Sequence, residues 1–295
     1  MLFSTAVGVV FIILPPVFTL IYLRFTYIFL RLEKYRKLEC YQLMIQIGIL
    51  DSLTAPGFIA MGIAHIFGFD ASPIVGSLTA LIMVVGRMDG FLYVVLALNR
   101  LKVMTKLQYP QLIHTTIVLF TWVYGIAFIV YYTIPCCGII MHPGVYLPSV
   151  DPLKPYNKES WTIAGFIYEG TLCATFFIYV ILVIVIGWKR KKSTSLSSVT
   201  KELNIVVYAV VKFLLNMALS VAFHYIPATP PTSVVIIFTY IIKFLLVPPM
   251  LYLALFRSAR KDFFKRSRQV VVSSGGIHKH NTGILTLRRV TPEQS

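Results

Sequence analysis

Hydrophobic residues fall into seven long runs along the chain, and polar residues gather between those runs. A helix needs roughly 20 mostly apolar residues to cross the hydrocarbon core of a bilayer. Residues 181–186 are apolar at every position, whereas a membrane-spanning strand would alternate apolar and polar side chains. The pattern predicts an all-α membrane protein that folds as a seven-transmembrane helix bundle. We expect its helices near residues 3–30, 40–67, 74–99, 112–135, 161–188, 203–226 and 233–256.

Composition agrees with this assignment. Hydrophobic residues make up 57% of the chain and charged residues 13%, and the mean hydropathy is +0.79. A water-soluble chain of this composition would have too little polar surface to cover itself. Residues 1–23 contain no basic residue that could form the start of a cleavable signal. We therefore expect the first run to be retained as a helix.

Basic residues predict how the bundle is oriented. Most of the 27 Lys and Arg residues follow the first, third, fifth and seventh runs, whereas Lys154 and Lys158 are those of the opposite loops. Basic loops are retained in the cytoplasm, so we expect the N-terminus outside. The net charge of +16 then reflects topology and attraction to anionic membrane lipids. It does not require a nucleic-acid partner.

A few ionisable residues interrupt the apolar runs. Such groups are costly at the bilayer centre and normally face the bundle interior. Opposite charges on different helices, such as Asp51 or Asp89 with Lys243, would form ion pairs, either for stability or as an activation switch. Arg87 and Asp89 are two positions apart, so each requires a partner on another helix. The full set is Asp51, Arg87, Asp89, Glu169, Lys212 and Lys243.

The third run ends in a short motif. Leu98-Asn99-Arg100 resembles the Asp-Arg-Tyr signature of rhodopsin-like receptors, with Asn99 replacing the acid and Leu101 the aromatic residue. The resemblance implies that Arg100 contacts a G protein, with Asn99 and Lys102 beside it in the coupling site. Loss of the acid places the usual inactive-state lock in doubt.

Three further matches follow the same receptor pattern in chain order. They are Asp51 in the second run, Trp122 in the fourth and Pro249-Met250-Leu251-Tyr252 in the seventh. The last resembles Asn-Pro-x-x-Tyr, with Pro248 replacing the asparagine. The resemblance implies that Pro249 and Tyr252 take part in the activation switch, together with Asp51, Asp89 and Lys243.

A short amphipathic eighth helix is expected after this motif. Its apolar face would carry Phe256, Ala259, Phe263 and Phe264, and its basic face Arg257, Arg260, Lys261 and Lys265. This is the pattern of a helix lying on the inner leaflet. We therefore expect residues 1–265 to form the receptor domain and residues 266–295 a disordered cytoplasmic tail.

Departures from the rhodopsin pattern narrow the family. Residues 69–77 contain no cysteine, so the usual disulfide between the outer loop and helix three cannot form. Helix six lacks Cys-Trp-x-Pro, and helix one lacks a Gly-Asn pair. Leu98-Asn99-Arg100, together with Gly48-Ile49-Leu50-Asp51, is similar to nematode serpentine chemoreceptors, of class T or the related classes X and V.

This resemblance implies a chemosensory function. Such a receptor would lie in the plasma membrane of a ciliated sensory neuron, bind a small environmental molecule within the bundle and activate a heterotrimeric G protein. Side chains at helix depth that could contact the ligand, or simply pack, are Met83, Arg87, Tyr168, Phe223, His224 and Tyr240. No cofactor or metal is expected, because no metal-ligand spacing is present.

Transporters, channels, opsins and enzymes are the alternatives to a chemosensory receptor. A transporter or ligand-gated channel could use Arg87, Asp89 and Lys243 within the membrane. An opsin would carry retinal on a helix-seven lysine, but Lys243 lies one residue closer to the proline motif than in opsins, which turns an α-helix by about 100°. Enzymatic motifs such as G-x-S-x-G and H-E-x-x-H are absent from the sequence. An inverted seven-helix channel would place the N-terminus inside.

Overall fold

The computed structural model describes residues 2–68, 73–108, 110–134, 137–141, 146–192, 196–227 and 229–264. Within these residues, seven helical spans are long and apolar enough to cross a membrane, which confirms the predicted helix bundle. The predicted tail, residues 266–295, lies outside the described residues, so the proposed domain boundary stays a prediction. The helices are α1 (Leu2–Arg31), α2 (Glu33–Arg36), α3 (Glu39–Ser52), α4 (Ala55–Phe67), α5 (Pro73–Thr105), α6 (Leu112–Thr133), α7 (Asn157–Lys192), α8 (Leu196–Tyr225), α9 (Pro230–Ile241), the π-helix η1 (Ile242–Leu246), α10 (Val247–Leu255) and α11 (Arg257–Phe264).

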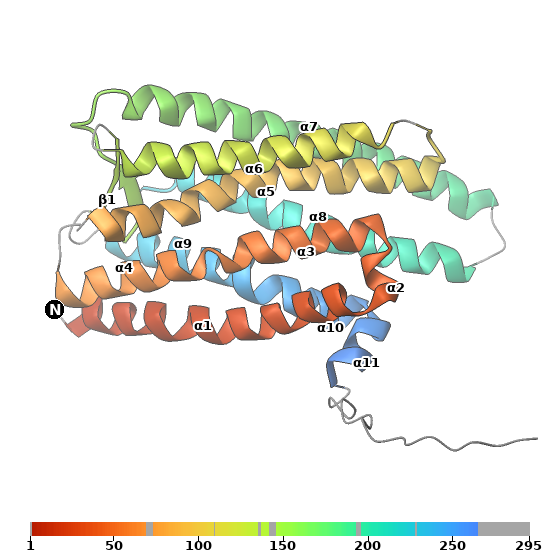
Figure 1. Cartoon of the computed structure of the whole chain (residues 1–295), viewed down its shortest axis with the longest axis horizontal. Coiled ribbons are helices and arrows are strands. Elements are labelled where there is room, and N and C mark those ends of the chain that lie inside the picture. Colours follow the sequence, from red (N-terminus) through yellow and green to blue (C-terminus); the bar gives the residue numbers. More distant parts are fainter. Residues whose placement is uncertain are drawn as a thin grey trace, which may run out of the picture. The chain divides into compact units, whose positions relative to one another are not determined.

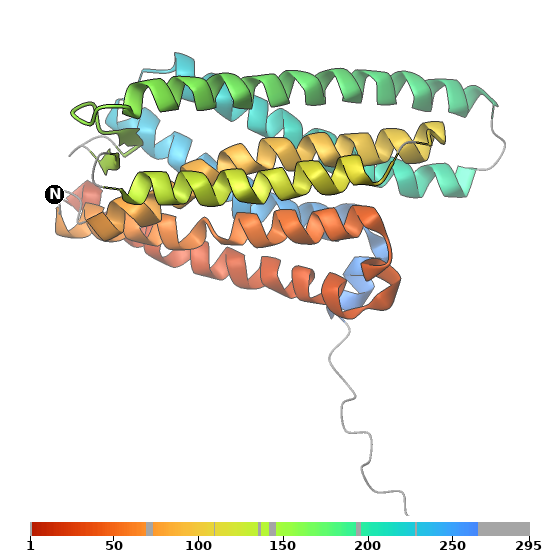
Figure 2. The same cartoon turned by 45° about the horizontal axis from the view of Figure 1, so that its top comes forward.

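The bundle has two distinguishable ends (Figure 1). One end carries the start of α1 and a two-stranded hairpin, β1 (Ile139–Met141) and β2 (Pro148–Val150), and we call it the hairpin end. The other carries α2 and α11, and we call it the α11 end. Figure 2 shows the same two ends after rotation. The basic loop residues of α2 and α11 therefore lie at one end of the bundle, as the orientation prediction requires.

Helix α5 forms the centre of the bundle. It packs against α3, α4, α6, α7 and α8, and its buried positions are mostly apolar. It continues to Thr105, six residues beyond the expected end at residue 99. Arg100 is therefore held inside a regular helix and not at its end.

The second span is broken, whereas the sequence pattern predicted one helix over residues 40–67. Leu53 and Thr54 separate α3 from α4, and Pro56 lies in the first turn of α4. Proline has no N–H to donate to the preceding turn, and its ring crowds the carbonyl there. At the break, the Asp51 carbonyl accepts from both the N–H and the hydroxyl of Thr54, at 3.1 Å and 2.6 Å. The break therefore lies just beyond buried Asp51.

The seventh span contains a different irregularity. Before Pro248 and Pro249 the helix widens into η1, and the Val247 N–H donates to the carbonyl of Ile242, five residues earlier. Two adjacent prolines remove two helical donors, and the π turn lies directly before them. By contrast, α1 runs without interruption through Pro15 and Pro16.

Helices α1 and α4 approach each other closely at two glycines. A methyl group added at Gly62 would lie 2.6 Å from the Gly8 carbonyl oxygen, and one added at Gly8 would lie 2.7 Å from the Gly62 carbonyl oxygen. Small residues allow helix backbones to pack closely in membranes, where van der Waals contact drives association. These two glycines set the spacing between α1 and α4.

The hairpin is anchored by an asparagine. Ile139 pairs with Val150 in an antiparallel register. The buried Asn157 side chain at the start of α7 donates to the Gly138 carbonyl at 3.0 Å and to the Asp151 carbonyl at 2.9 Å. Cys137 is buried, and Cys136 lies outside the described residues. Among the described residues, these hydrogen bonds across the base of the hairpin hold the loop in place.

Helix α11 packs its apolar side on α1. Ala259 is fully buried, and the Phe263 ring stacks on Phe25 at a centroid distance of 4.4 Å. Arg24 lies over the same Phe263 ring and donates to the Phe263 carbonyl at 2.6 Å. Phe264 is 68% exposed and does not share the contact of Phe263 with Phe25, so its predicted place on a face toward the inner leaflet stays a prediction. Adjacent residues of an α-helix point about 100° apart around its axis, so Phe263 and Phe264 cannot both face the same narrow contact.

Residues of α2 tie α11 to the bundle from the other side. The Tyr35 hydroxyl donates to Asp262 at 2.7 Å, and Lys34 pairs with the same carboxylate at 2.6 Å. Burial beside Asp262 raises the pKa of the Tyr35 hydroxyl above its usual value, so it remains a donor.

Candidate ligand cavity and coupling network

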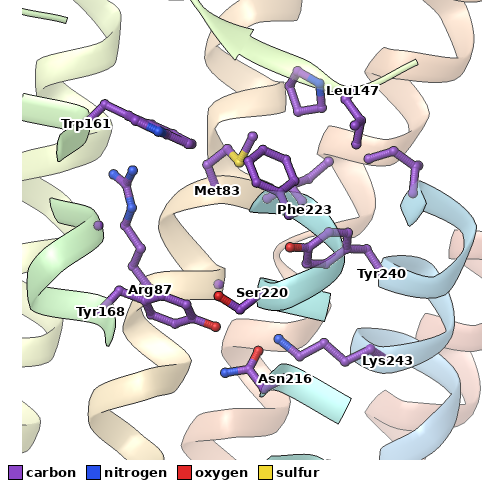
Figure 3. Close-up of a pocket in the computed structure, with 15 residues that line it drawn as sticks. Met83, Arg87, Leu147, Trp161, Tyr168, Asn216, Ser220, Phe223, Tyr240 and Lys243 are labelled. Atoms are coloured by element: carbon purple, nitrogen blue, oxygen red, sulfur yellow. The ribbon is translucent and has the colours of Figure 1, made fainter. Parts of the chain in front are cut away.

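A small cavity of about 80 Å³ opens between α5, α7, α8 and the seventh span, beneath the hairpin (Figure 3). Every residue predicted to contact ligand lines it except His224, whose side chain lies outside what the structure describes. The lining consists of Ile82, Met83, Gly86, Arg87, Leu147, Pro148, Trp161, Gly165, Tyr168, Asn216, Ser220, Phe223, Ile237, Tyr240 and Lys243.

Arg87 forms one side of the cavity. It is 7% exposed and donates to the Tyr132 hydroxyl at 3.2 Å. Its guanidinium carbon lies 4.4 Å from the Trp161 ring centroid and 5.4 Å from that of Phe128. Aromatic ring faces attract a cation without neutralising its charge. Arg87 thus places a buried positive charge beside an aromatic wall.

Lys243 forms the opposite side, where its side chain reaches from η1 into the cavity (Figure 3). Its amine lies 3.4 Å from the Asp89 carboxylate, and both side chains are buried. The Tyr93 hydroxyl donates to the same Asp89 oxygen at 2.9 Å. Of the two predicted partners of Lys243, Asp51 and Asp89, the structure therefore pairs it with Asp89.

Asp51 has a different partner. Lys212 of α8 lies 2.6 Å from Asp51 Oδ2, and neither side chain has any solvent exposure. Tyr22 of α1 donates to the same oxygen at 2.9 Å. The alternative pairing of Asp51 with Lys243 is therefore not the one found, because the rotation of α8 brings Lys212 to Asp51 first. This pair joins α1, α3 and α8 at mid-depth.

The two ion pairs are neighbours. The Lys212 amine lies 5.4 Å from the ring centroid of Tyr93, the tyrosine that donates to Asp89. Beyond Asp51, the Tyr22 ring contacts Tyr252, and the hydroxyls of Tyr252 and Tyr208 lie 3.1 Å apart. Buried polar side chains thus run from the cavity floor at Lys243 to Tyr252 in α10, one turn after Pro249.

At the α11 end, Asn99 and Arg100 form the start of a second cluster. Arg100 donates to Asn99 Oδ1 at 2.6 Å, and Asn99 donates to Glu39 Oε2 at 2.6 Å. His114 lies 2.8 Å from the other Glu39 oxygen, and Gln111 also donates to it. A carboxylate from α3 therefore occupies the place of the acid that the motif lacks, with Asn99 as the link.

A cavity of about 460 Å³ opens beside this cluster. Asn99, Arg100 and Glu39 line it, together with Phe256 and Arg257 from the junction of α10 and α11. Lys102 is not among its lining residues and donates to Gln111 at 3.3 Å on the exposed side of the helix.

Comparison with known proteins identifies this architecture. The family model described as serpentine type 7TM GPCR chemoreceptor Srt matches residues 3–273. The chain belongs to the Srt family of serpentine chemoreceptors. No curated protein sequence matches it. Squid rhodopsin has a similar fold, with a TM-score of 0.69 and 13% sequence identity, covering 88% of this chain and 79% of the rhodopsin chain.

In this Srt receptor, the helix around Lys243 differs from the regular α-helix used above to compare Lys243 with the retinal-binding lysine of opsins. An α-helix is expected between Lys243 and the proline motif, whereas the π-helix η1 occupies most of this interval. Lys243 lines the cavity despite its offset in sequence. The likeness to squid rhodopsin is a likeness of fold, and the Lys243 amine is paired with Asp89.

Several residues of the network were not expected from the sequence. Glu39 supplies the carboxylate of the Arg100 cluster. Tyr22 and Tyr93 supply hydroxyl donors to the carboxylates of Asp51 and Asp89. An isolated acid among basic residues at the start of the second run was a usable signal for Glu39. Glu169 showed the opposite outcome, because it is exposed on the side of α7.

Proposed function

We propose that this Srt receptor binds a small environmental molecule in the cavity beneath the hairpin and, when activated, couples to a heterotrimeric G protein at the α11 end. The observation that carries the proposal is the run of buried polar contacts between the two regions. Lys243 lines the cavity and pairs with Asp89, and Tyr252 lies in α10, which ends three residues later at the junction with α11.

Ligand binding would act by population shift. A ligand that contacts Lys243 in one arrangement of the helices more strongly than in another favours that arrangement by its difference in affinity. A few kcal/mol would suffice to change the active fraction substantially, since about 5.5 kcal/mol reverses a 1:99 ratio. The Asp89–Lys243 and Asp51–Lys212 pairs are elements that such a shift would rearrange.

Coupling would require the Arg100 cluster to open. In the present arrangement Asn99 and Glu39 hold Arg100 against α3. Release of Asn99 would free the guanidinium to bind a G protein in the neighbouring cavity. We place this end in the cytoplasm of a sensory neuron and α11 on the inner leaflet, in agreement with the basic residues found there.

The test is Gα activation in cells that express the receptor or Arg100→Ala at equal surface levels. Loss of both basal and ligand-driven activation in the variant is expected. Lys37→Ala, which removes an exposed positive charge at the same end of the bundle, serves as the matched control and should retain most activity. Normal activation by Arg100→Ala would refute the proposed coupling role.

A further inference from the structure

We propose that the cavity beneath the hairpin recognises a small organic anion, a short-chain carboxylate, through Arg87. This inference rests on the proposed receptor function and names the chemical class of its ligand. It would account for an arginine whose charge the described residues leave uncompensated.

The argument begins with the balance of buried charge. Each buried carboxylate at mid-depth already has a lysine: Asp51 has Lys212 and Asp89 has Lys243. Arg87 is almost fully buried, and its polar contact among the described residues is the Tyr132 hydroxyl. A hydroxyl satisfies one donor of a guanidinium and none of its charge. A buried charge without a counter-ion is costly within a membrane protein, so an anion that completes the pair would bind favourably.

The cavity lining favours the same sign of ligand. None of the described residues that line it is an aspartate or glutamate. Arg87 and Lys243, both positively charged, lie on two sides of it (Figure 3). A protonated amine would add a third positive charge beside Arg87 and Lys243 with no acid of its own to meet. A carboxylate would accept from the guanidinium in the bidentate geometry that arginine suits.

The aromatic wall orients this interaction. Trp161 and Phe128 lie close to the guanidinium carbon, within cation–π distance. Both rings restrict how the Arg87 side chain can turn. Arg87 lines the cavity and donates to Tyr132 from one nitrogen, so a bound anion would meet its other donors.

Size limits the rest of the ligand. An apolar cavity of roughly 150 Å³ holds benzene, and this one is about 80 Å³. Met83, Phe223 and Ile237 supply apolar contacts for the body of the molecule. The fit is to a branched or straight chain smaller than a benzene ring, with the carboxylate directed to Arg87.

The test uses purified full-length receptor in detergent and measures binding of three probes by calorimetry and by thermal stabilisation. The probes are isobutyrate, its neutral amide isobutyramide and the cation isobutylamine, which share one apolar body. Isobutyrate should bind at least about tenfold more tightly than either of the others, the effect expected from a close buried charge pair. Equal binding of the amide or the amine, or no binding of isobutyrate at millimolar concentration, would overturn the proposal.

Variants assign the effect to Arg87. Arg87→Gln should weaken isobutyrate binding by at least about tenfold, and Arg87→Lys, which keeps the charge but loses the bidentate geometry, should weaken it less than Arg87→Gln does. Lys158→Gln removes an exposed positive charge near the same end of α7 and should bind as the wild type does. Undiminished binding by folded Arg87→Gln would also overturn the proposal. The wild-type comparison of the three probes decides the question if that variant fails to fold.

The binding assay contains no G protein, so the two proposals can fail separately. Arg87-dependent binding of isobutyrate without Gα activation would retain the anion site and refute its role in signalling. Basal Gα activation that depends on Arg100, together with no preference for isobutyrate, would retain the receptor function and refute the anion site.

Discussion

The Asn99 amide donates to the Glu39 carboxylate at 2.6 Å, and this bond links α5 to α3 beside Arg100. Glu39 also contacts His114 and Gln111 of the neighbouring segment. One carboxylate thus holds three polar side chains, and through Asn99 it holds the arginine that we propose for coupling.

Glu39→Gln should raise ligand-independent signalling. The neutral amide loses the charge that strengthens hydrogen bonds to Asn99 and His114. We expect basal Gα activation to increase several-fold at equal surface expression. Glu33→Gln is the matched control, since Glu33 pairs with Lys37 on the exposed side of the same end. Unchanged basal activity in Glu39→Gln would show that this cluster does not restrain the receptor.

Asp51→Asn should destabilise the bundle strongly. Removing one partner of a buried ion pair leaves the Lys212 charge uncompensated, which costs about 3–5 kcal/mol. Lys34→Gln breaks the pair with Asp262, whose lysine is half exposed, and should cost about 0–1 kcal/mol. Thermal unfolding of the purified variants measures both. Comparable losses from the two substitutions would contradict the role assigned to the buried pair.

Gly62→Ala should separate α1 from α4. The added methyl group would clash with the Gly8 carbonyl oxygen, a backbone atom that cannot turn aside. Overpacking of this kind costs about 1–3 kcal/mol. Gly170→Ala places the same methyl group where nothing lies within 4 Å, so it should be neutral or stabilising by up to about 1 kcal/mol through helix propensity. Thermal stability that falls equally in both would rule out close packing as the cause.

Asn157→Ala should loosen the hairpin above the cavity. The variant loses both hydrogen bonds from Asn157 to the carbonyls of Gly138 and Asp151. Amide hydrogen exchange at Asp151, whose N–H donates to the Gly138 carbonyl at 3.2 Å, should become faster, because opening of the hairpin then requires less free energy. Exchange at the centre of α5 provides the internal reference and should not change. Unchanged exchange at the hairpin would mean that another contact holds it.

Epitope tags test the orientation of the bundle. A tag before Met1 should bind antibody on intact cells, whereas a tag after Ser295 should require permeabilised cells. The opposite pattern would identify an inverted seven-helix protein and place the Arg100 cavity outside.

Apolar runs were sufficient to predict the spans, because crossing a bilayer requires about 20 mostly apolar residues, a pattern that one or two polar residues do not obscure. Interruptions within a span were harder to predict. Pro56 breaks the second span, whereas Pro15 and Pro16 leave α1 intact. The outcome depends on whether neighbouring helices and side chains such as Thr54 satisfy the freed carbonyls. That information is tertiary.

Partners across the bundle show the same limit. The sequence identified Asp51, Asp89 and Lys243 as ionisable groups that need partners, but it did not assign Lys212 to Asp51. Pairing depends on how each helix is rotated about its axis, and neighbouring residues differ by about 100°. The ligand residues were easier to place, since bulky side chains at one depth of adjacent helices converge on the same cavity.

In the π segment η1 each hydrogen bond joins residues five apart, whereas in an α-helix it joins residues four apart, so the seventh span contains an extra residue at this point. Such a segment is a reversible register defect. Were it to return to α geometry, the helix on one side of it would rotate by about 100° relative to the other. Lys243 and Pro249 lie on opposite sides of most of this segment. A rotation that moved Lys243 away from Asp89 would therefore also turn Tyr252 relative to the cavity. The seventh span would then carry the effect of a bound ligand to the α11 end by rotation about its axis, without bending.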